Sequence, residues 1–169
     1  MVVIKPIIKS QLLARLIVIF FFISFSTAGT AMSIFDAGKA CIASAIKVQV
    51  MKNGEPVKNA RVVREVDWHN VGKESDSATT DEQGFFELPE LYMRSITRSL
   101  LPLEFVATTQ IKLDVEGETY EILYAAKRTE APNDEFGGKQ GIFKCDLNQE
   151  EEELHRFGAS MLDTRCTFE

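Results

Sequence analysis

The chain has 169 residues, 45% hydrophobic and 26% charged, which is the composition of a folded globular protein and not of a disordered one. The length suits one domain preceded by a targeting segment. The formal net charge of −6 gives an acidic surface, which disfavours nucleic acid and anionic lipid as binding partners.

Residues 1–31 are predicted to be an export signal. Three basic residues precede an apolar stretch over residues 16–25, and small residues follow up to residue 31, which is the layout of a cleaved signal peptide. The alternative is an uncleaved membrane anchor, because residues 16–35 carry no charge and are long enough to span a bilayer. After residue 31 the chain has sixteen basic and twenty-five acidic residues, a net charge of −9.

The rest of the chain alternates between apolar and polar residues in the manner of β-strands. A short, poorly ordered lead-in over residues 32–42 is expected before a domain that runs from residue 42 to residue 169. Asn53-Gly54 predicts a hairpin turn, because both residues tolerate a positive φ, and residues 81–84 predict a second turn that ends in glycine. Strands are predicted at residues 46–50, 60–68, 77–80, 85–88, 105–115, 120–124 and 142–147. The strands at 105–115 and 120–124 are predicted to form a hairpin around a turn at residues 116–119, with residues 120, 122 and 124 alternating with 121 and 123 along the return strand.

Three stretches depart from the strand pattern and are candidate binding segments. Residues 69–76 are predicted to form a polar, hairpin-like loop. Residues 91–102 are predicted to form a short helix or irregular crossover between sheets, in which Arg94 and Arg98 share one helical face. Residues 129–140 are predicted to be a mobile connection and a candidate binding loop. The candidate partner-binding residues are therefore Arg94, Arg98 and His69, although for the two arginines we favour the interpretation that they are ordinary solvated or locally paired side chains.

Two short segments carry a family-like pattern. Residues 54–62 read G-x-P-V-x-x-A-x-V, and residues 80–89 read T-D-x-x-G-x-F-x-x-P. This arrangement resembles the carboxypeptidase regulatory-like, or transthyretin-like, β-sandwich. The resemblance implies an all-β, Ig-like antiparallel sandwich of about seven strands with one short helical crossover, placed after the hydrophobic signal helix. It implies no activity, since such modules are mostly binding or stabilising appendages.

Three cysteines follow the predicted signal, and in an oxidising exported compartment two of them should pair. Sequence geometry alone leaves three pairings open. We favour Cys145–Cys166, which would tether a C-terminal tail to the last long strand and would contribute roughly 3 kcal/mol to stability. Cys41 would then be free or would pair between molecules.

No pattern in the chain indicates catalysis. The sequence lacks HExxH, CxxC and GxSxG motifs and has no glycine-rich nucleotide loop. A nucleophilic pair of His155 with Cys145 or Cys166 would be conceivable, but exported cysteines are more often bridged. We therefore expect no enzyme activity, no cofactor and no metal site.

The whole chain after the signal is also similar to an uncharacterised family of short exported proteins of Gram-negative bacteria. The matching segments are NGEPVKNARV, TDEQGFFELP, SITRSLLP, GGKQGIFKCDLN and the terminal RCTFE. This resemblance supports the Cys145–Cys166 pairing, because both cysteines lie in matching segments and Cys41 does not. It implies a periplasmic location, or an inner-membrane anchor that holds the domain facing the periplasm.

The predicted function is that of a non-enzymatic exported module that binds a protein partner. The leading hypothesis is an immunity or inhibitor protein against a secreted bacterial toxin, because the chain is small, exported, acidic and without catalytic residues. The alternative is a structural or envelope-associated module that binds an envelope component. Membrane contact is expected only through an uncleaved N-terminal segment.

Overall fold

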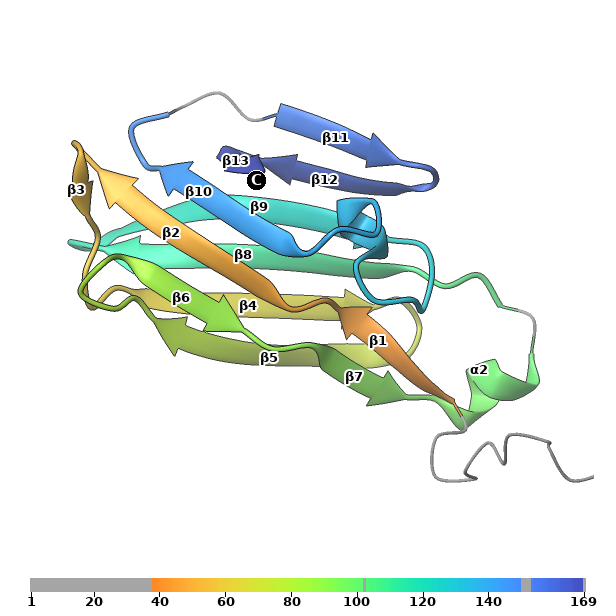
Figure 1. Ribbon diagram of the computed structural model, residues 1–169. Coiled ribbons are helices and arrows are strands. Elements are labelled where there is room, and N and C mark those ends of the chain that lie inside the picture. The colour runs from red at the N-terminus through yellow and green to blue at the C-terminus, as the bar shows by residue number, and fades with distance from the viewer. Residues whose placement is uncertain (1–37, 102, 150–152, 169) are drawn as a thin grey trace, which may run out of the picture. The chain divides into compact units, whose positions relative to one another are not determined.

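The part of the chain that the structure describes is built almost entirely from β-strands (Figure 1). The structure is a computed structural model that describes residues 38–101, 103–149 and 153–168, with the backbone alone at residues 98 and 99. The chain divides into residues 1–36 and a compact unit that begins at residue 37. The predicted signal segment therefore lies outside the described residues. Within the described ranges, no helix has the length and apolar character needed to cross a membrane.

One face of the molecule is an antiparallel sheet with the strand order β11-β12-β9-β8-β4-β5. Hydrophobic side chains alternate along its central strands, so one side of the sheet is buried and the other is exposed. The strands are β4 (Arg61–Trp68), β5 (Gly72–Thr79), β8 (Ala107–Val115), β9 (Glu118–Lys127), β11 (Glu153–Phe157) and β12 (Ser160–Thr164).

The opposing sheet has the order β13-β10-β2, and β6 and β3 both pair with the other edge of β2. Its strands are β2 (Ile46–Lys52), β3 (Glu55–Pro56), β6 (Phe85–Leu88), β10 (Gly141–Asp146) and β13 (Cys166–Phe168). Strands β2 and β10 run parallel, which differs from the expected antiparallel arrangement. The connection between them is most of the chain, so no short-range sequence signal could indicate this pairing.

A third, two-stranded sheet pairs β1 (Lys39–Ala43) with β7 (Leu91–Arg94). It follows on from the β2–β6 pair, because β1 leads into β2 and β6 leads into β7 across short breaks at residues 44–45 and 89–90. The pairing of these segments is therefore interrupted at neighbouring points on both of them. The short helix α2 (Ile96–Leu100) follows β7, and the 3-10 helix η2 (Asp134–Phe136) precedes β10.

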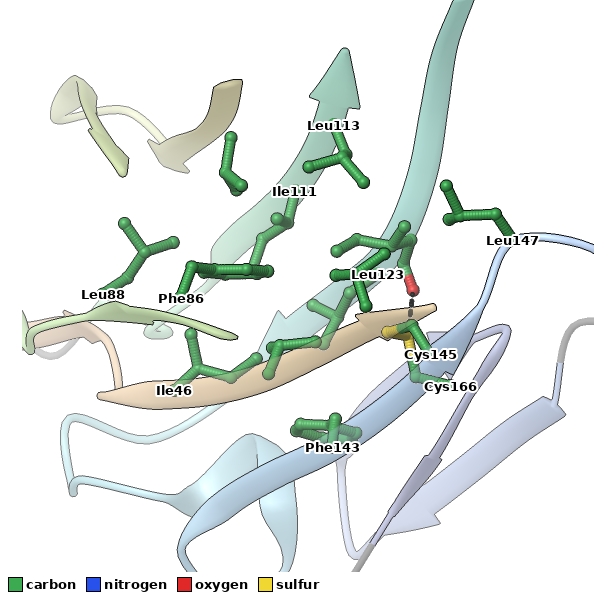
Figure 2. Close-up of a cluster of buried hydrophobic side chains, with 14 of the residues drawn as sticks. Ile46, Phe86, Leu88, Ile111, Leu113, Leu123, Phe143, Cys145, Leu147 and Cys166 are labelled. Carbon is green, nitrogen blue, oxygen red and sulfur yellow. Dashed lines mark hydrogen bonds between the residues drawn. A yellow bond between two sulfur atoms is a disulfide. The ribbon is translucent and has the colours of Figure 1, made fainter. Parts of the chain in front are cut away.

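The main core lies between the two larger sheets (Figure 2). Phe86 and Phe143 from one sheet pack in the same cluster as Ile111, Leu113 and Leu162 from the other. A second cluster, with Trp68 and Phe105 at 5.5 Å between ring centroids, fills the space under β1. The two clusters together show that the fold is a sandwich of packed sheets.

The Cys145–Cys166 disulfide joins β10 to β13 at the edge of the main core (Figure 2). This is the pairing that the sequence favours. Among the described residues, Cys41 is a free cysteine and is buried. The terminal residues are not a loose tail, because β12 pairs with β9 in one sheet while β13 pairs with β10 in the other.

Both predicted turns are confirmed. Asn53 and Gly54 have φ angles of 55° and 79° and join β2 to β3 by a two-residue turn. The Gly84 amide donates to the Asp81 carbonyl, and the Asp81 carboxylate accepts from the amides of Gln83 and Phe85. The predicted β8–β9 hairpin is also confirmed.

Several predicted loops are instead strands at sheet edges. The loop expected at residues 69–76 is a short turn followed by β5, and the lead-in expected up to residue 42 contains β1. Residues 91–94 form β7, so the predicted helix begins only at Ile96. These predictions were wrong because an edge strand is short or polar, and its pairing depends on a distant partner.

The predicted alternation along the return strand of the hairpin is interrupted by a β-bulge. Ile111 pairs with Leu123 whereas Lys112 pairs with Glu121, so Ile122 is an extra residue. Ile122 and Leu123 are therefore both buried, and Tyr124 is turned outward. Beyond the bulge the inward phase continues to Lys127, a cation at the end of β9 that is buried.

Candidate functional site

A network of buried polar side chains lies at the break between the β1–β7 sheet and the β2–β6 pair. Ser44 lies in the break between β1 and β2, and its neighbours in the network come from β4, β9 and η2. Buried polar atoms are costly unless they are hydrogen-bonded, so a cluster of them in a small sandwich needs a structural account.

Ser44 is the centre of the network. Its amide and its hydroxyl donate to the two carboxylate oxygens of Glu135, both at 2.9 Å. The hydroxyl oxygen accepts from the Lys127 Nζ at 3.0 Å and from the Asn133 amide at 2.6 Å. A serine hydroxyl has one proton and two lone pairs, so the Ser44 side chain is fully satisfied.

Lys127 and Glu135 form a buried ion pair. The Lys127 Nζ lies 2.9 Å from the Glu135 Oε2, and the two side chains are only 1% and 3% exposed. The Lys127 ammonium also contacts the Cys41 Sγ at 3.7 Å. Glu135 thus accepts three hydrogen bonds and Lys127 has three partners, which offsets the cost of removing both charges from water.

Arg64 connects this network to both breaks between the strands. Its guanidinium donates from Nη1 to the Ser44 carbonyl at 2.9 Å and from Nη2 to the Pro89 carbonyl at 2.5 Å. It also forms a bidentate pair with Asp76, its partner across β4 and β5, at 2.8 and 2.6 Å. One side chain that is 1% exposed therefore holds the β1–β2 break and the β6–β7 break together.

Cys41 is buried beside the ion pair. Its Sγ donates to the Ala43 carbonyl at 3.4 Å. Burial raises the pKa of the Cys41 thiol above its ordinary value of 9.0, and the nearby Lys127 only partly opposes that shift. Cys41 is thus a neutral, packed thiol at physiological pH and not an activated nucleophile.

A surface groove of about 510 Å³ adjoins the network. It shares Asn133 and Pro89 with the network, and apolar residues of β2, β6 and β10 line much of the rest. Its lining combines these apolar residues with the charged residues Lys47, Glu87 and Glu90, a mixture that many protein-binding surfaces share. The residues that line it are Ala45, Ile46, Lys47, Glu87, Leu88, Pro89, Glu90, Asn133, Gln140, Gly141 and Ile142.

The three residues predicted to contact a partner come from different elements. His69 is exposed in the turn after β4, and Arg94 is the exposed last residue of β7. Arg98 lies in α2, so Arg94 and Arg98 do not share a helical face as predicted. The reason is that Leu91–Arg94 pairs with β1 and is extended.

Two other candidate arrangements are corrected. Cys145 and Cys166 are bonded to each other, so neither can pair with His155 as a nucleophile. The centre of the 129–140 segment is not mobile, because Glu135 and Phe136 are buried in η2. Over the described ranges, no group of histidine, cysteine, aspartate or glutamate side chains is arranged to hold a metal ion.

Sequence reasoning missed Ser44, Lys127 and Glu135. Ser44 is 83 residues from Lys127 and 91 from Glu135, so no local pattern joins them. Only Arg64 left a signal, because it stands in the same alternating phase as Ala60 and Val62, where an apolar residue is expected.

The family comparison places the chain among proteins that share this domain. Residues 46–150 match the family described as "Domain of unknown function (DUF6795)", so the chain belongs to the DUF6795 family. No curated protein matches the chain. The family match begins at the first residue of β2 and leaves out β1 and β11–β13, although all of these strands pair with strands that it covers or with each other.

Proposed function

We propose that the chain is an exported, non-enzymatic binding module with a transthyretin-like sandwich fold, and that the groove lined by β2, β6 and β10 takes a segment of a protein partner. The observation that carries this proposal is the groove itself, whose lining combines apolar and charged residues. A hollow of this size admits one or two side chains of a partner and excludes water around them.

The buried network supports a binding role over a catalytic one. Its reactive groups, Cys41, Ser44 and Lys127, are buried and satisfied by neighbours. Catalysis would require a nucleophile that reaches a substrate, whereas these groups are hydrogen-bonded to one another around the β1–β2 break. A rigid backbone beside a groove reduces the entropy lost on binding, which favours affinity.

The charge of the exported part favours a basic partner. Sixteen basic and twenty-five acidic residues follow the predicted signal, so oppositely charged proteins would be drawn to it in solution. Together with the small size and the predicted export, this supports an immunity or inhibitor protein that blocks a secreted bacterial toxin in the periplasm.

A photo-crosslinking experiment in cells tests the proposal. A photoreactive amino acid is placed at Ile142, a half-buried residue of the groove, and at Glu116, a matched exposed position in the β8–β9 turn. We expect a protein adduct from position 142 and none from position 116, and Ile142→Asp should remove protection against the crosslinked toxin.

Two results would overturn the proposal. Equal adducts from both positions would mean that the groove is not the binding face. Co-sedimentation of the protein with purified cell wall, without any protein adduct at position 142, would show that the module binds an envelope component instead.

A further inference from the structure

An exposed apolar segment covers one end of the molecule. Four large hydrophobic residues of α2 and the chain after it are exposed to an unusual degree: Ile96 69%, Leu100 77%, Leu101 50% and Leu103 51%. They stand close together in sequence, at the end of the sandwich where β1 begins (Figure 1). Single exposed apolar residues are normal on protein surfaces, but a group of four indicates a surface that contacts another molecule or a membrane when the protein functions.

The charges around this segment differ from those of the rest of the protein. Residues 91–103 include two arginines and no acidic residue, and the glutamates at either side of them, Glu90 and Glu104, bond to Tyr92 and Arg128. Lys39 is paired with Arg94 across β1 and β7, and its Nζ lies 4.5 Å from the ring centroid of Tyr92, which is 43% exposed. Apolar side chains bordered by basic and tyrosine side chains are typical of surfaces that rest in a membrane interface.

The chain enters the sandwich at the same place. The Ser95 amide donates to the Gly38 carbonyl at 2.9 Å. Gly38, the first residue that the structure describes, is therefore held beside Ser95, the residue that precedes α2. A Cβ on Gly38 would lie 2.6 Å from the Ser95 carbonyl oxygen, which shows how closely the two backbones approach. In the sequence, the uncharged run of residues 16–35, the alternative membrane anchor, ends three positions before Gly38.

We propose that the α2 segment, residues 96–103, rests in the interface of a lipid bilayer and holds this end of the sandwich against the membrane. The overall acidic charge disfavours anionic lipid, but this end has no acidic residue in its apolar segment, so apolar insertion dominates there. The helix α2 has five residues and is far too short to cross the membrane, so it lies on the surface. This inference uses none of the groove residues and stands independently of the proposed function.

A depth measurement in lipid tests this contact. The full-length chain is synthesised in a cell-free system in the presence of nanodiscs of phosphatidylethanolamine and phosphatidylglycerol, which avoids signal peptidase. A nitroxide is attached at Leu100→Cys or, as the matched control at the opposite end, at Glu116→Cys, both in a Cys41→Ala background. Collision rates with oxygen, which concentrates in lipid, and with a water-soluble nickel chelate report the depth of each label.

We expect the label at position 100 to collide several-fold more with oxygen relative to nickel than the label at position 116. A label at position 103 should behave like the one at position 100. Equal nickel access at positions 100 and 116 would overturn the proposal. Shielding of position 100 from both reagents would also overturn it, because a protein and not lipid would then cover the segment.

Discussion

The Lys127 side chain is a cation at the end of a core strand. Its contacts with Glu135, Ser44 and Cys41 offset the cost of burying that charge. Replacing it with methionine keeps the volume but leaves the Glu135 carboxylate buried without its counter-charge. We expect Lys127→Met to lower the free energy of unfolding by about 3–5 kcal/mol, the usual cost of breaking a buried pair from one side. Urea unfolding followed by circular dichroism would measure the loss.

Two comparisons isolate the cause of that loss. The double variant Lys127→Met/Glu135→Gln removes both charges and should be more stable than Lys127→Met alone. The matched control is the surface ion pair of Lys47 and Glu87, whose charged atoms lie 2.6 Å apart and whose side chains are 49% and 66% exposed. Lys47→Met should lower the free energy of unfolding by less than about 1 kcal/mol. A Lys127→Met variant as stable as Lys47→Met would show that the buried pair does not support the fold.

Cys41 gives the protein a pH dependence in the alkaline range. Burial raises the pKa of its thiol above 9.0, so the unfolded chain loses the Cys41 proton at a lower pH than the folded one does. The stabilisation is fully present below the pKa of the unfolded thiol and is lost as the pH rises through the folded-state pKa. Between about pH 8 and pH 10.5, we expect the unfolding free energy of the wild type to fall more steeply than that of Cys41→Ala.

The slope, and not the absolute stability, is the informative quantity for Cys41, because Cys41→Ala also leaves a small cavity. The other titrating groups are common to both proteins and cancel in the comparison. Parallel slopes would contradict the prediction. A thiol reagent should also react with Cys41 in the folded protein only slowly at pH 8, because the thiol is neutral and buried.

At the scale of elements, the tight turns set the register of the strands, and two glycines allow a matched test. Gly84 and Gly54 have nearly the same positive φ, 77° and 79°, but a Cβ at Gly84 would lie 2.5 Å from the Val50 carbonyl oxygen, whereas a Cβ at Gly54 would meet nothing within 4 Å. Gly54→Ala should cost about 1–2 kcal/mol for backbone conformation alone.

Gly84→Ala should lower the free energy of unfolding by about 1–3 kcal/mol more than Gly54→Ala does, which is the typical penalty for forcing extra atoms into packed structure. Thermal unfolding of the two variants side by side measures the difference. Equal destabilisation would mean that the β2 backbone yields to the extra methyl group, and that the close approach of Gly84 to Val50 is not needed for the fold.

The disulfide connects the last strand to the centre of one sheet. It closes a loop with a sequence separation of 21, so chain entropy predicts a contribution of about 3 kcal/mol. In a Cys41→Ala background, which prevents thiol exchange, reduction should lower the urea midpoint, and Cys145→Ala/Cys166→Ala should reproduce the reduced value. An unchanged midpoint after complete reduction would show that pairing of β13 with β10 suffices without the bond.

The elements that the sequence predicts well are those whose signal is local. The residue types at Asn53-Gly54 and Asp81–Gly84 are those that their turns require. In the β8–β9 hairpin, apolar and polar residues alternate clearly up to the bulge. The strand predicted at residues 77–80 covers only the end of β5, because the residues of β5 are mostly polar and its pairing with β4 comes from the fold. The parallel pairing of β2 with β10 could not be predicted either, because the two strands are far apart in the sequence.

The candidate site was far less predictable than the fold. A serine in a break, a lysine after a bulge and a glutamate in a polar loop each have an ordinary surface interpretation in the sequence. Only the packing of three distant segments makes Ser44, Lys127 and Glu135 into one network. Arg64 was the exception, since a charge in a buried strand phase requires a partner, and the structure supplies Asp76.

At the scale of the whole molecule, the C-terminal strands close the sandwich by adding to both sheets. Strand β12 pairs with β9 and buries Leu162, while β13 pairs with β10 and buries Cys166. Residues 153–168 therefore contribute to the same core as the residues matched by the family, which end at residue 150. The end of the family match is not a structural boundary of the domain.

A chain that ends at Gln149 tests this view of the whole molecule. The loss of β11–β13 uncovers the inward faces of β9 and β10. Each buried side chain that is lost or uncovered contributes about 1.5–3 kcal/mol, so several of them together exceed the free energy of unfolding of a typical domain. We expect no cooperative thermal transition and rapid proteolysis, even with Cys145→Ala to remove the unpaired thiol. Leu154→Glu, at a side chain of β11 that is 47% exposed, is the control and should unfold like the wild type. A truncated chain that melts cooperatively within a few degrees of the full chain would show that β2–β10 forms the complete folding unit, and that the C-terminal strands are an accessory to it.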